Sequence, residues 1–220
     1  MRRIALLAGL ALVAAACGSE EPTPGEPCPT GAPTEVEAQS ILEGATLATV
    51  TVSGAVTGEF SMELHGDEAP IATANFVSLA RCGFYDGIKF HRVLSGFVIQ
   101  AGDPGTKTQE GDFPGIGAGG AGYEFDIEPP AEGFDYTQYS VSMANDTRTN
   151  DSQFFVALTD LRGRLTPTYT IFGQVTGGMD IVEAIGAVPV NDPRIGVPLT
   201  AVSIDSIVIS GGSGPTPSGD

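Results

Sequence analysis

Short segments of alternating apolar and polar residues dominate the middle of the chain and predict strands more often than helices. Such segments, rich in β-branched and aromatic residues, lie at 47–52, 59–64, 88–94, 97–101, 139–144, 154–158, 171–175 and 201–209. Helical spacing appears at 70–81, which starts with Pro70 and is followed by Gly83, and at the shorter 179–185. Strands and helices do not alternate along the chain. The pattern therefore predicts a mainly β fold, a closed eight-stranded antiparallel barrel capped by two α-helices.

The two ends of the chain have a different character. Arg2 and Arg3 precede an apolar run and three alanines, so residues 1–16 have the arrangement of a signal peptide. The apolar run is too short to span a membrane. Residues 17–40 are rich in Pro, Glu, Thr and Gly, and 211–220 in Gly, Ser and Pro. We expect a flexible tether and a disordered tail there, with the folded domain at 41–210.

Cys17 directly follows the three alanines. Small residues leading into a cysteine resemble a bacterial lipobox, whose Cys becomes the lipid-modified first residue, although Ala14 stands where that pattern usually has Leu. We expect a lipoprotein held by Cys17 at the extracytoplasmic face of the bacterial cell membrane. The alternative is ordinary cleavage after Ala16, which would give a secreted or periplasmic soluble protein. Either way the protein leaves the cytoplasm.

The other two cysteines are Cys28 and Cys82. In an oxidising compartment they could form a disulfide between the tether and the domain. A sequence gives no separation in space, so two free thiols are the alternative.

The charge balance limits the partners. The chain has 10 Lys and Arg against 27 Asp and Glu, a net charge of −17. Nucleic-acid binding needs a basic surface, so this charge argues against a nucleic-acid partner. It also disfavours binding flat on an anionic membrane, which leaves the lipid anchor as the expected membrane contact. Solubility is the simplest explanation of the charge.

Two motifs that suggest cofactors lack the context they need. The glycines at 115, 117 and 120 match a dinucleotide fingerprint, but no strand precedes them and no helix follows. We interpret them instead as backbone that lets a peptide approach closely. His65 and His91 are the only histidines, and no third ligand stands at zinc-site spacing. We therefore expect no metal and no cofactor.

Polar residues interrupt the apolar segments in a way that predicts a surface groove. Arg92, Gln100, Asn145 and Gln153 recur among phenylalanines in three segments, with no nucleophile–base pair beside them. An arginine with apolar walls suits chemistry that needs a fixed cation in a dry pocket. Phe90 and Phe154 are expected in the barrel core.

These segments also carry a family resemblance. From about residue 48 to 209 the chain resembles cyclophilin-type peptidyl-prolyl isomerases. The matching blocks, in the family's order, are ANF (74–76), GFYDG (83–87), FHRV (90–93), GFVIQAGD (96–103), SMAN (142–145), SQFF (152–155) and IFG (171–173). The family fold is an eight-stranded antiparallel barrel with two helices, which agrees with the pattern-based prediction.

The resemblance implies an enzyme that isomerises Xaa–Pro bonds and binds proline-containing polypeptides without a cofactor. Together with the signal-peptide pattern it leads us to expect exported proteins as substrates, and we expect a monomer. Arg92 matches the catalytic arginine. The implied substrate-binding residues are the pocket walls Phe97, Val98, Phe155 and Leu165, the backbone-holding Gln100, Ala144, Asn145 and Gln153, the pocket-floor His91, and Tyr169, where many bacterial members also have Tyr.

The chain departs from the family pattern near 161–168. It has no tryptophan, and Arg164 or Leu161 fills the region where many members have one. The loop at 105–114 is longer than usual, and 146–151 is about one residue shorter. These departures leave an alternative open, a non-catalytic proline-peptide-binding module or chaperone that uses the same groove.

Overall fold

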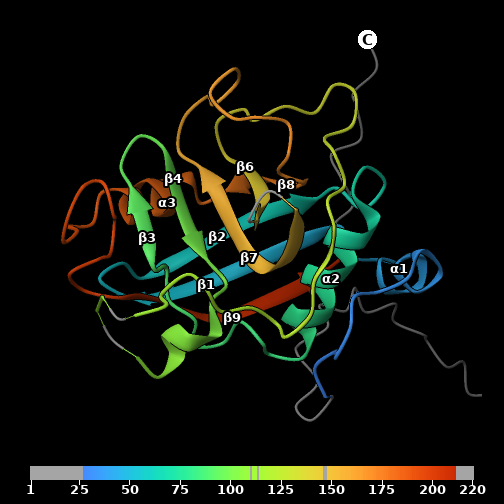
Figure 1. Cartoon of the computed structure of the whole chain (residues 1–220), viewed down its shortest axis with the longest axis horizontal. Helices are drawn as coiled ribbons and strands as arrows, with labels where there is room; N and C mark the ends of the chain where they lie inside the picture. Colours follow the sequence, from blue (N-terminus) through green and yellow to red (C-terminus); the bar gives the residue numbers. More distant parts are fainter. Residues whose placement is uncertain (1–26, 110, 113, 146–147, 212–220) are drawn as a thin grey trace, which may run out of the picture.

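The computed structural model describes residues 27–109, 111–112, 114–145 and 148–211. Figure 1 shows a curled sheet with helices at its edges. The predicted signal peptide at 1–16, the predicted lipidation site Cys17 and, apart from Gly211, the predicted tail at 211–220 lie outside the described residues.

One antiparallel sheet forms the molecule, in the strand order β3-β4-β7-β6-β8-β2-β1-β9. These strands are β1 (Leu47–Gly54), β2 (Gly58–Leu64), β3 (Arg92–Leu94), β4 (Val98–Ala101), β6 (Ser140–Asn145), β7 (Thr149–Ala157), β8 (Ile171–Gly177) and β9 (Val202–Ser210). A further two-residue strand, β5 (Phe125–Asp126), pairs with β7 off this path. The pattern did not predict β5, which is too short to show alternation.

The sheet closes where the chain before β3 meets β9. Phe90 N donates to Val202 O at 2.9 Å, Ile204 N donates to Ile88 O at 2.8 Å, and Lys89 forms a bridge with Ser203. The segment predicted as one strand at 88–94 is therefore divided between two partners, β9 first and then β4. The prediction of a mainly β, eight-stranded antiparallel barrel is confirmed.

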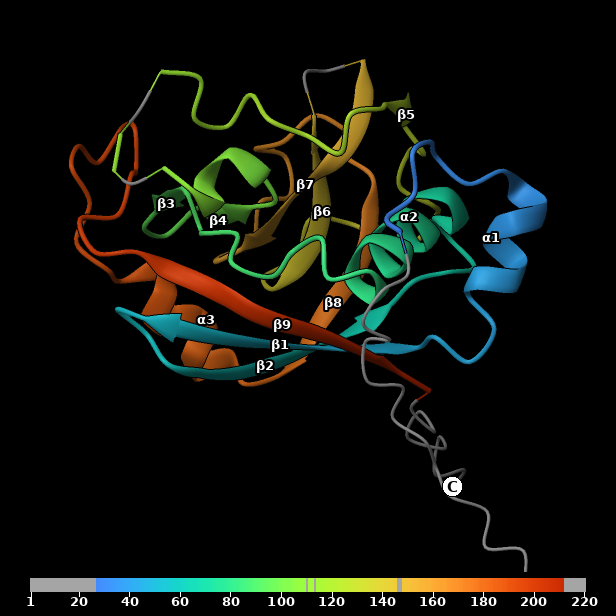
Figure 2. The ribbon, with the colours of Figure 1, turned by 90° about the horizontal axis from the view of Figure 1, so that it is seen from below.

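Two helices lie at opposite ends of the barrel, as predicted (Figure 2). Helix α2 (Pro70–Arg81) packs against β7, β8 and β9, and α3 (Met179–Gly186) packs against β2, β3 and β4. A 3₁₀ helix, η1 (Pro104–Lys107), lies in the segment predicted as a loop after β4. Within the described residues, no helix has the length and apolar content needed to cross a membrane.

The barrel core is aromatic. Phe76 of α2, Phe90, Phe154 and Phe172 are at most 1% exposed, and the Phe76 and Phe154 rings meet edge to face at 5.6 Å. The placement of Phe90 and Phe154 in the core is confirmed. Phe155, the next residue on β7, belongs to a separate cluster with Val98, because successive residues of a strand face opposite sides.

The prediction that 17–40 is a flexible tether is wrong for the part that the structure describes. Helix α1 (Glu35–Ile41) lies beside α2 (Figure 2). It begins with a capping box between Thr34 and Glu37, which satisfies backbone donors that a helix start leaves open. Ala38 is fully buried, and Arg81 Nη1 donates to Ile41 O at 2.8 Å. The folded region thus includes α1 and Cys28, which lie before the predicted start at 41.

A disulfide joins Cys28 to Cys82, just past the end of α2, with their Cα atoms 5.2 Å apart. This covalent bond explains why composition was misleading for the segment before α1. Composition indicates only how much apolar area a segment can bury. A cross-link can hold a polar segment in place even when that segment buries little apolar area.

Candidate active site

A pocket of about 330 Å³ lies on the face of β4, β6 and β7 that is opposite the barrel core. We call it the groove pocket. It gathers nine of the predicted site residues from four strands and two loops: Arg92, Phe97, Val98, Gln100, Ala144, Asn145, Phe155, Leu165 and Tyr169.

Apolar side chains form one part of the wall of the groove pocket. Val98 and Phe155 are at most 5% exposed, and the Tyr169 ring meets Phe155 edge to face at 5.5 Å. The Tyr136 hydroxyl donates to Tyr169 O at 2.9 Å and accepts from Tyr169 N at 3.1 Å, which fixes this part of the wall. Sequence reasoning missed Tyr136, because nothing in its local pattern indicates a partner 33 residues away.

Arg92 is held in this pocket by a chain of side-chain amides. Its Nη1 donates to Gln100 Oε1 at 3.3 Å, and Gln100 Nε2 donates to Gln153 Oε1 at 2.9 Å. Arg92 and Gln100 are directly opposite each other in the β3–β4 ladder. Because each amide has one acceptor end and one donor end, this chain orients Gln100 with its oxygen toward the guanidinium.

This series of hydrogen bonds continues into the loop that contains the glycines at 115, 117, 119 and 120, which we call the glycine-rich loop. Gln153 Nε2 donates to Gly117 O at 2.9 Å and to Gly119 O at 2.7 Å. Asp103, which is 1% exposed, accepts from Gly117 N at 2.7 Å. A Cβ on Gly119 would lie 2.1 Å from Asp103 Oδ1. Glycine is therefore needed at 119 because the backbone approaches a carboxylate of the protein itself.

Gln153 lines a neighbouring hollow of about 320 Å³, not the groove pocket itself. We call this hollow the polar pocket. It shares Gln100, Ala144 and Asn145 with the groove pocket and is bordered on its far side by Glu124 and Asp151. Asn145 Nδ2 donates to Thr168 O at 2.8 Å, which ties the shared wall to the loop before β8. Burial raises the pKa of Asp151.

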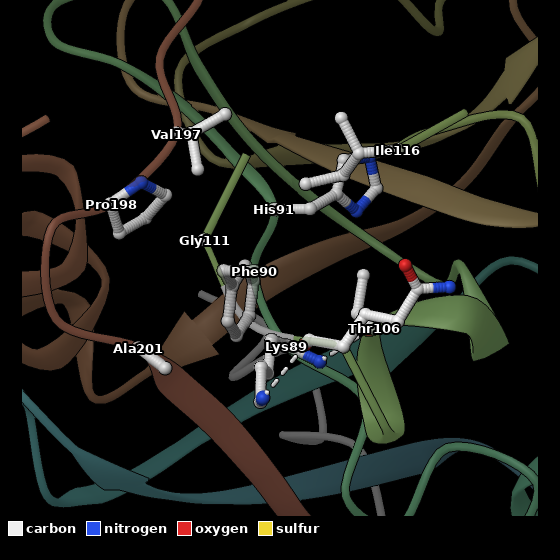
Figure 3. A pocket seen from close by; sticks show the side chains of 10 residues that line it. Lys89, Phe90, His91, Thr106, Gly111, Ile116, Val197, Pro198 and Ala201 are labelled. Carbon is white, nitrogen blue, oxygen red and sulfur yellow. Dashed lines mark hydrogen bonds between the residues drawn. The ribbon is translucent and has the colours of Figure 1, made fainter. Parts of the chain in front are cut away.

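His91 does not line the groove pocket, so its expected place on the pocket floor is corrected. It borders a separate hollow together with Arg92 and Gln100, and the close-up shows its ring beside Ile116, across from Val197 (Figure 3). Burial lowers the pKa of His91 to about 4, so the imidazole is neutral at pH 7.

The region without tryptophan is filled by Arg164. Its guanidinium carbon lies 5.3 Å from the centre of the Phe97 ring, at the rim of the groove pocket. Leu161, the other residue considered, is fully buried beneath the loop.

Within the residues that the structure describes, no group of three or more His, Cys, Asp or Glu side chains is arranged to hold a metal ion.

The fold and the groove pocket define a class of protein. They describe an antiparallel barrel with a small pocket in which apolar side chains lie beside one guanidinium, an arrangement that can hold an apolar ring and polarise an amide next to it.

Comparison with known proteins identifies the family. The family model described as "Cyclophilin type peptidyl-prolyl cis-trans isomerase/CLD" matches residues 47–209. Peptidyl-prolyl cis-trans isomerase B of Streptomyces anulatus is 41% identical over 172 residues, covering 69% of this chain and 91% of that protein. A peptidyl-prolyl cis-trans isomerase of Helicobacter pylori is 38% identical over 131 residues, covering 58% of this chain and 74% of that protein.

A solved structure agrees with this. The crystal structure of a Cryptosporidium parvum cyclophilin type peptidyl-prolyl cis-trans isomerase has a TM-score of 0.65 and 30% identity, covering 78% of this chain and 99% of that one. The chain belongs to the cyclophilin-type peptidyl-prolyl cis-trans isomerases and is an enzyme of that activity.

Proposed function

We propose that this isomerase acts on Xaa–Pro bonds of exported proteins and that Arg92 stabilises the twisted amide. Rotation about the peptide bond breaks amide resonance, with a barrier of about 18–20 kcal/mol. No bond is made or broken in this reaction, so the enzyme needs only to bind the twisted form more tightly than either planar isomer.

Arg92 is suited to that task. In the twisted amide the proline nitrogen regains its lone pair and can accept a hydrogen bond, which it cannot do in the planar form. Arg92 donates to this nitrogen, or to the prolyl carbonyl oxygen while its charge points toward the nitrogen. A fixed charged donor in a site that excludes water contributes about 3–4 kcal/mol, by analogy with the deletion of oxyanion-hole donors. The hydrogen bond from Arg92 to Gln100 supports the required orientation.

The apolar walls hold the substrate. Phe97, Val98, Phe155 and Leu165 surround a space that accommodates the pyrrolidine ring of proline. A related structure supports this, since the Cryptosporidium parvum protein with 28% identity and a TM-score of 0.62 was crystallised in the presence of the dipeptide Ala-Pro. Exclusion of water around the ring also favours the less polar twisted amide.

One observation carries this proposal. The hydrogen bond to Gln100 holds the Arg92 guanidinium beside the apolar side chains of the groove pocket. The test is NMR exchange between the cis and trans forms of a short Xaa–Pro peptide, measured with the full chain and with Arg92→Ala. We expect Arg92→Ala to lower kcat/KM by about 10²- to 10³-fold, and Arg92→Lys to be poor because Lys lacks the planar fork. Full exchange with Arg92→Ala would remove Arg92 from the chemistry. Peptide binding without faster exchange in the native protein would indicate a binding module.

The site of action is the second part of the proposal. The signal-peptide pattern at 1–16 and Cys17 support export and lipidation. The disulfide between Cys28 and Cys82 also supports export, since disulfides persist in oxidising compartments. In bacterial cells that make the full chain, we expect labelled palmitate to enter the protein and the protein to sediment with membranes. Cys17→Ser should lose both properties. A soluble, unlabelled native protein would contradict the lipid anchor.

A further inference from the structure

Arg164 is the arginine at the rim of the groove pocket that the proposed chemistry does not use. Its side chain is exposed, and its guanidinium stacks on the Phe97 ring with 5.3 Å between the guanidinium carbon and the ring centre. Phe97 is also a wall of the groove pocket. A cation is therefore held beside the place where a proline ring would bind.

The backbone around Arg164 keeps it there. Leu161 is fully buried and its N–H donates to Tyr136 O at 2.8 Å, while Leu165 lines the groove pocket. The N–H groups of Arg164 and Leu165 both donate to Leu161 O, at 2.9 and 3.2 Å. Arg164 thus stands in a tight turn between two anchored leucines.

The stacking leaves the donors of Arg164 available. One face of the planar guanidinium covers the ring, and the N–H groups lie in the plane of the guanidinium, where they can bind a carboxylate with two parallel hydrogen bonds. Two other surface arginines are already used in this way. Arg162 forms a salt bridge with Asp160, and Arg194 forms one with Asp192 at 2.9 Å.

The two sides of the groove carry opposite charge. Arg164 stands on the Phe97 side of the groove pocket, whereas Glu124 and Asp151 border the polar pocket beyond the shared residues. A peptide that crosses both pockets therefore meets a cation at one end and carboxylates at the other. The net charge of −17 would disfavour acidic peptides in general, so any preference for them must arise locally.

We propose that Arg164 is a specificity-determining residue that makes the enzyme prefer substrates with an acidic residue on one side of the proline. The substrate class is an Xaa–Pro segment with an Asp or Glu placed to meet the Phe97 side of the groove. This inference rests on the proposed function, because it concerns which peptides the groove pocket turns over.

The test uses five short peptides with the same Xaa–Pro centre: one neutral, two with Glu on either side of the proline, and two with Lys at those positions. NMR exchange gives kcat/KM for each with the full chain, Arg164→Ala, Arg164→Glu and the control Arg162→Ala. Arg162 is the matched control because it has the same charge and lies two residues from Arg164. Its guanidinium is already paired with Asp160, so we do not expect it to bind a substrate carboxylate.

We expect the native protein to prefer one Glu peptide over its Lys counterpart by about 3- to 10-fold, the range for a charged hydrogen bond near a surface. Arg164→Ala should remove this preference, Arg164→Glu should reverse it, and Arg162→Ala should keep it. Rates with the neutral peptide serve as the reference for each protein, so that a general loss of turnover is separated from a change in charge preference.

Other outcomes overturn the inference. Equal rates for Glu and Lys peptides, or the same loss of preference in Arg162→Ala, would mean that Arg164 does not select substrates. An equal preference for Glu on both sides of the proline would overturn the proposal that Arg164 recognises an acidic residue on one side only. A native protein that accelerates no peptide, the neutral one included, would instead refute the proposed function and this inference with it.

Discussion

The groove pocket is not the largest hollow of the molecule. A hollow of about 620 Å³ beside α1, which we call the α1 hollow, is nearly twice its volume. It is lined by Glu43, Glu63, Asp67 and Glu68 around His65 and Phe134, and it contains no Lys or Arg. The groove pocket places the Arg92 guanidinium beside Phe97, Val98, Phe155 and Leu165. Volume alone therefore does not define a site, because the larger hollow has no Lys or Arg to act as a charged donor beside its apolar side chains.

The two regions are also built differently. The groove pocket takes its residues mainly from neighbouring strands, whose ladder places Arg92 opposite Gln100. The α1 hollow is formed by turns and by a seven-residue helix that a disulfide and a capping box hold in place. We therefore expect changes near α1 to affect stability and changes near the glycine-rich loop to affect both stability and catalysis.

The largest effect on stability should come from the disulfide. It closes a loop with a sequence separation of 54, for which the loss of unfolded-state entropy predicts up to about 4 kcal/mol. The double variant Cys28→Ser/Cys82→Ser should unfold at lower denaturant concentration, yet keep its kcat/KM because neither cysteine lines the groove pocket. Native protein treated with a reductant should show the same loss of stability and the same unchanged kcat/KM as the double variant. A collapse of activity under folding conditions would show that the two regions are coupled.

Gly119→Ala should affect the groove side. The added methyl group would meet the buried Asp103 carboxylate, so the loop must move and Gln153 loses its acceptors. Overpacking of this kind costs about 1–3 kcal/mol, and we expect kcat/KM to fall as well because the support of Arg92 is disturbed. Gly31→Ala is the matched control, since a Cβ there has no atom within 4 Å. Unchanged activity in Gly119→Ala would mean that the loop does not support the site.

Acid should destabilise the protein through His91. Its pKa is lowered from 6.5 to about 4 in the folded state, chiefly by burial. The unfolded chain therefore takes up a proton below pH 6.5 that the folded chain refuses. The stability that is fully present above pH 6.5 is lost as the pH falls toward 4, with about 2 kcal/mol lost at pH 5.

Urea unfolding of native protein and His91→Gln at pH 7.5 and pH 5 measures this loss. The variant should lose about 2 kcal/mol less between the two pH values than the native protein does. His65→Gln is the control, because the pKa of His65 is also lowered by burial but Glu68 and Glu63 oppose the shift. Equal pH dependence in native protein and His91→Gln would show that His91 does not carry the effect.

The smallest effect should come from the cap of α1. Thr34→Ala removes the side chain that accepts from Glu37 N, and loss of such a cap costs about 1 kcal/mol. Thr34→Ser should retain the cap. Denaturant midpoints of the three proteins measure the difference, and kcat/KM should be the same in all of them. A decrease of activity in Thr34→Ala alone would extend the influence of α1 to the groove.

Much of the fold follows from local patterns. The apolar spacing at 70–81 coincides with α2, and alternation located the eight strands of the barrel path to within a few residues. The same alternation separates Phe154 in the core from Phe155 in the groove pocket. These features are readable because periodicity depends on neighbours in the chain, and the family resemblance added the site residues that periodicity cannot assign.

Only the tertiary structure decided the remaining points. It divided 88–94 between two partner strands, placed His91 outside the groove pocket, and chose Arg164 over Leu161 at its rim. It also turned a polar segment into α1 through a bond between cysteines 54 positions apart. Strand partners, amide orientation and disulfide pairing depend on residues distant in the chain. Their positions are set when the barrel closes, so no local pattern contains them.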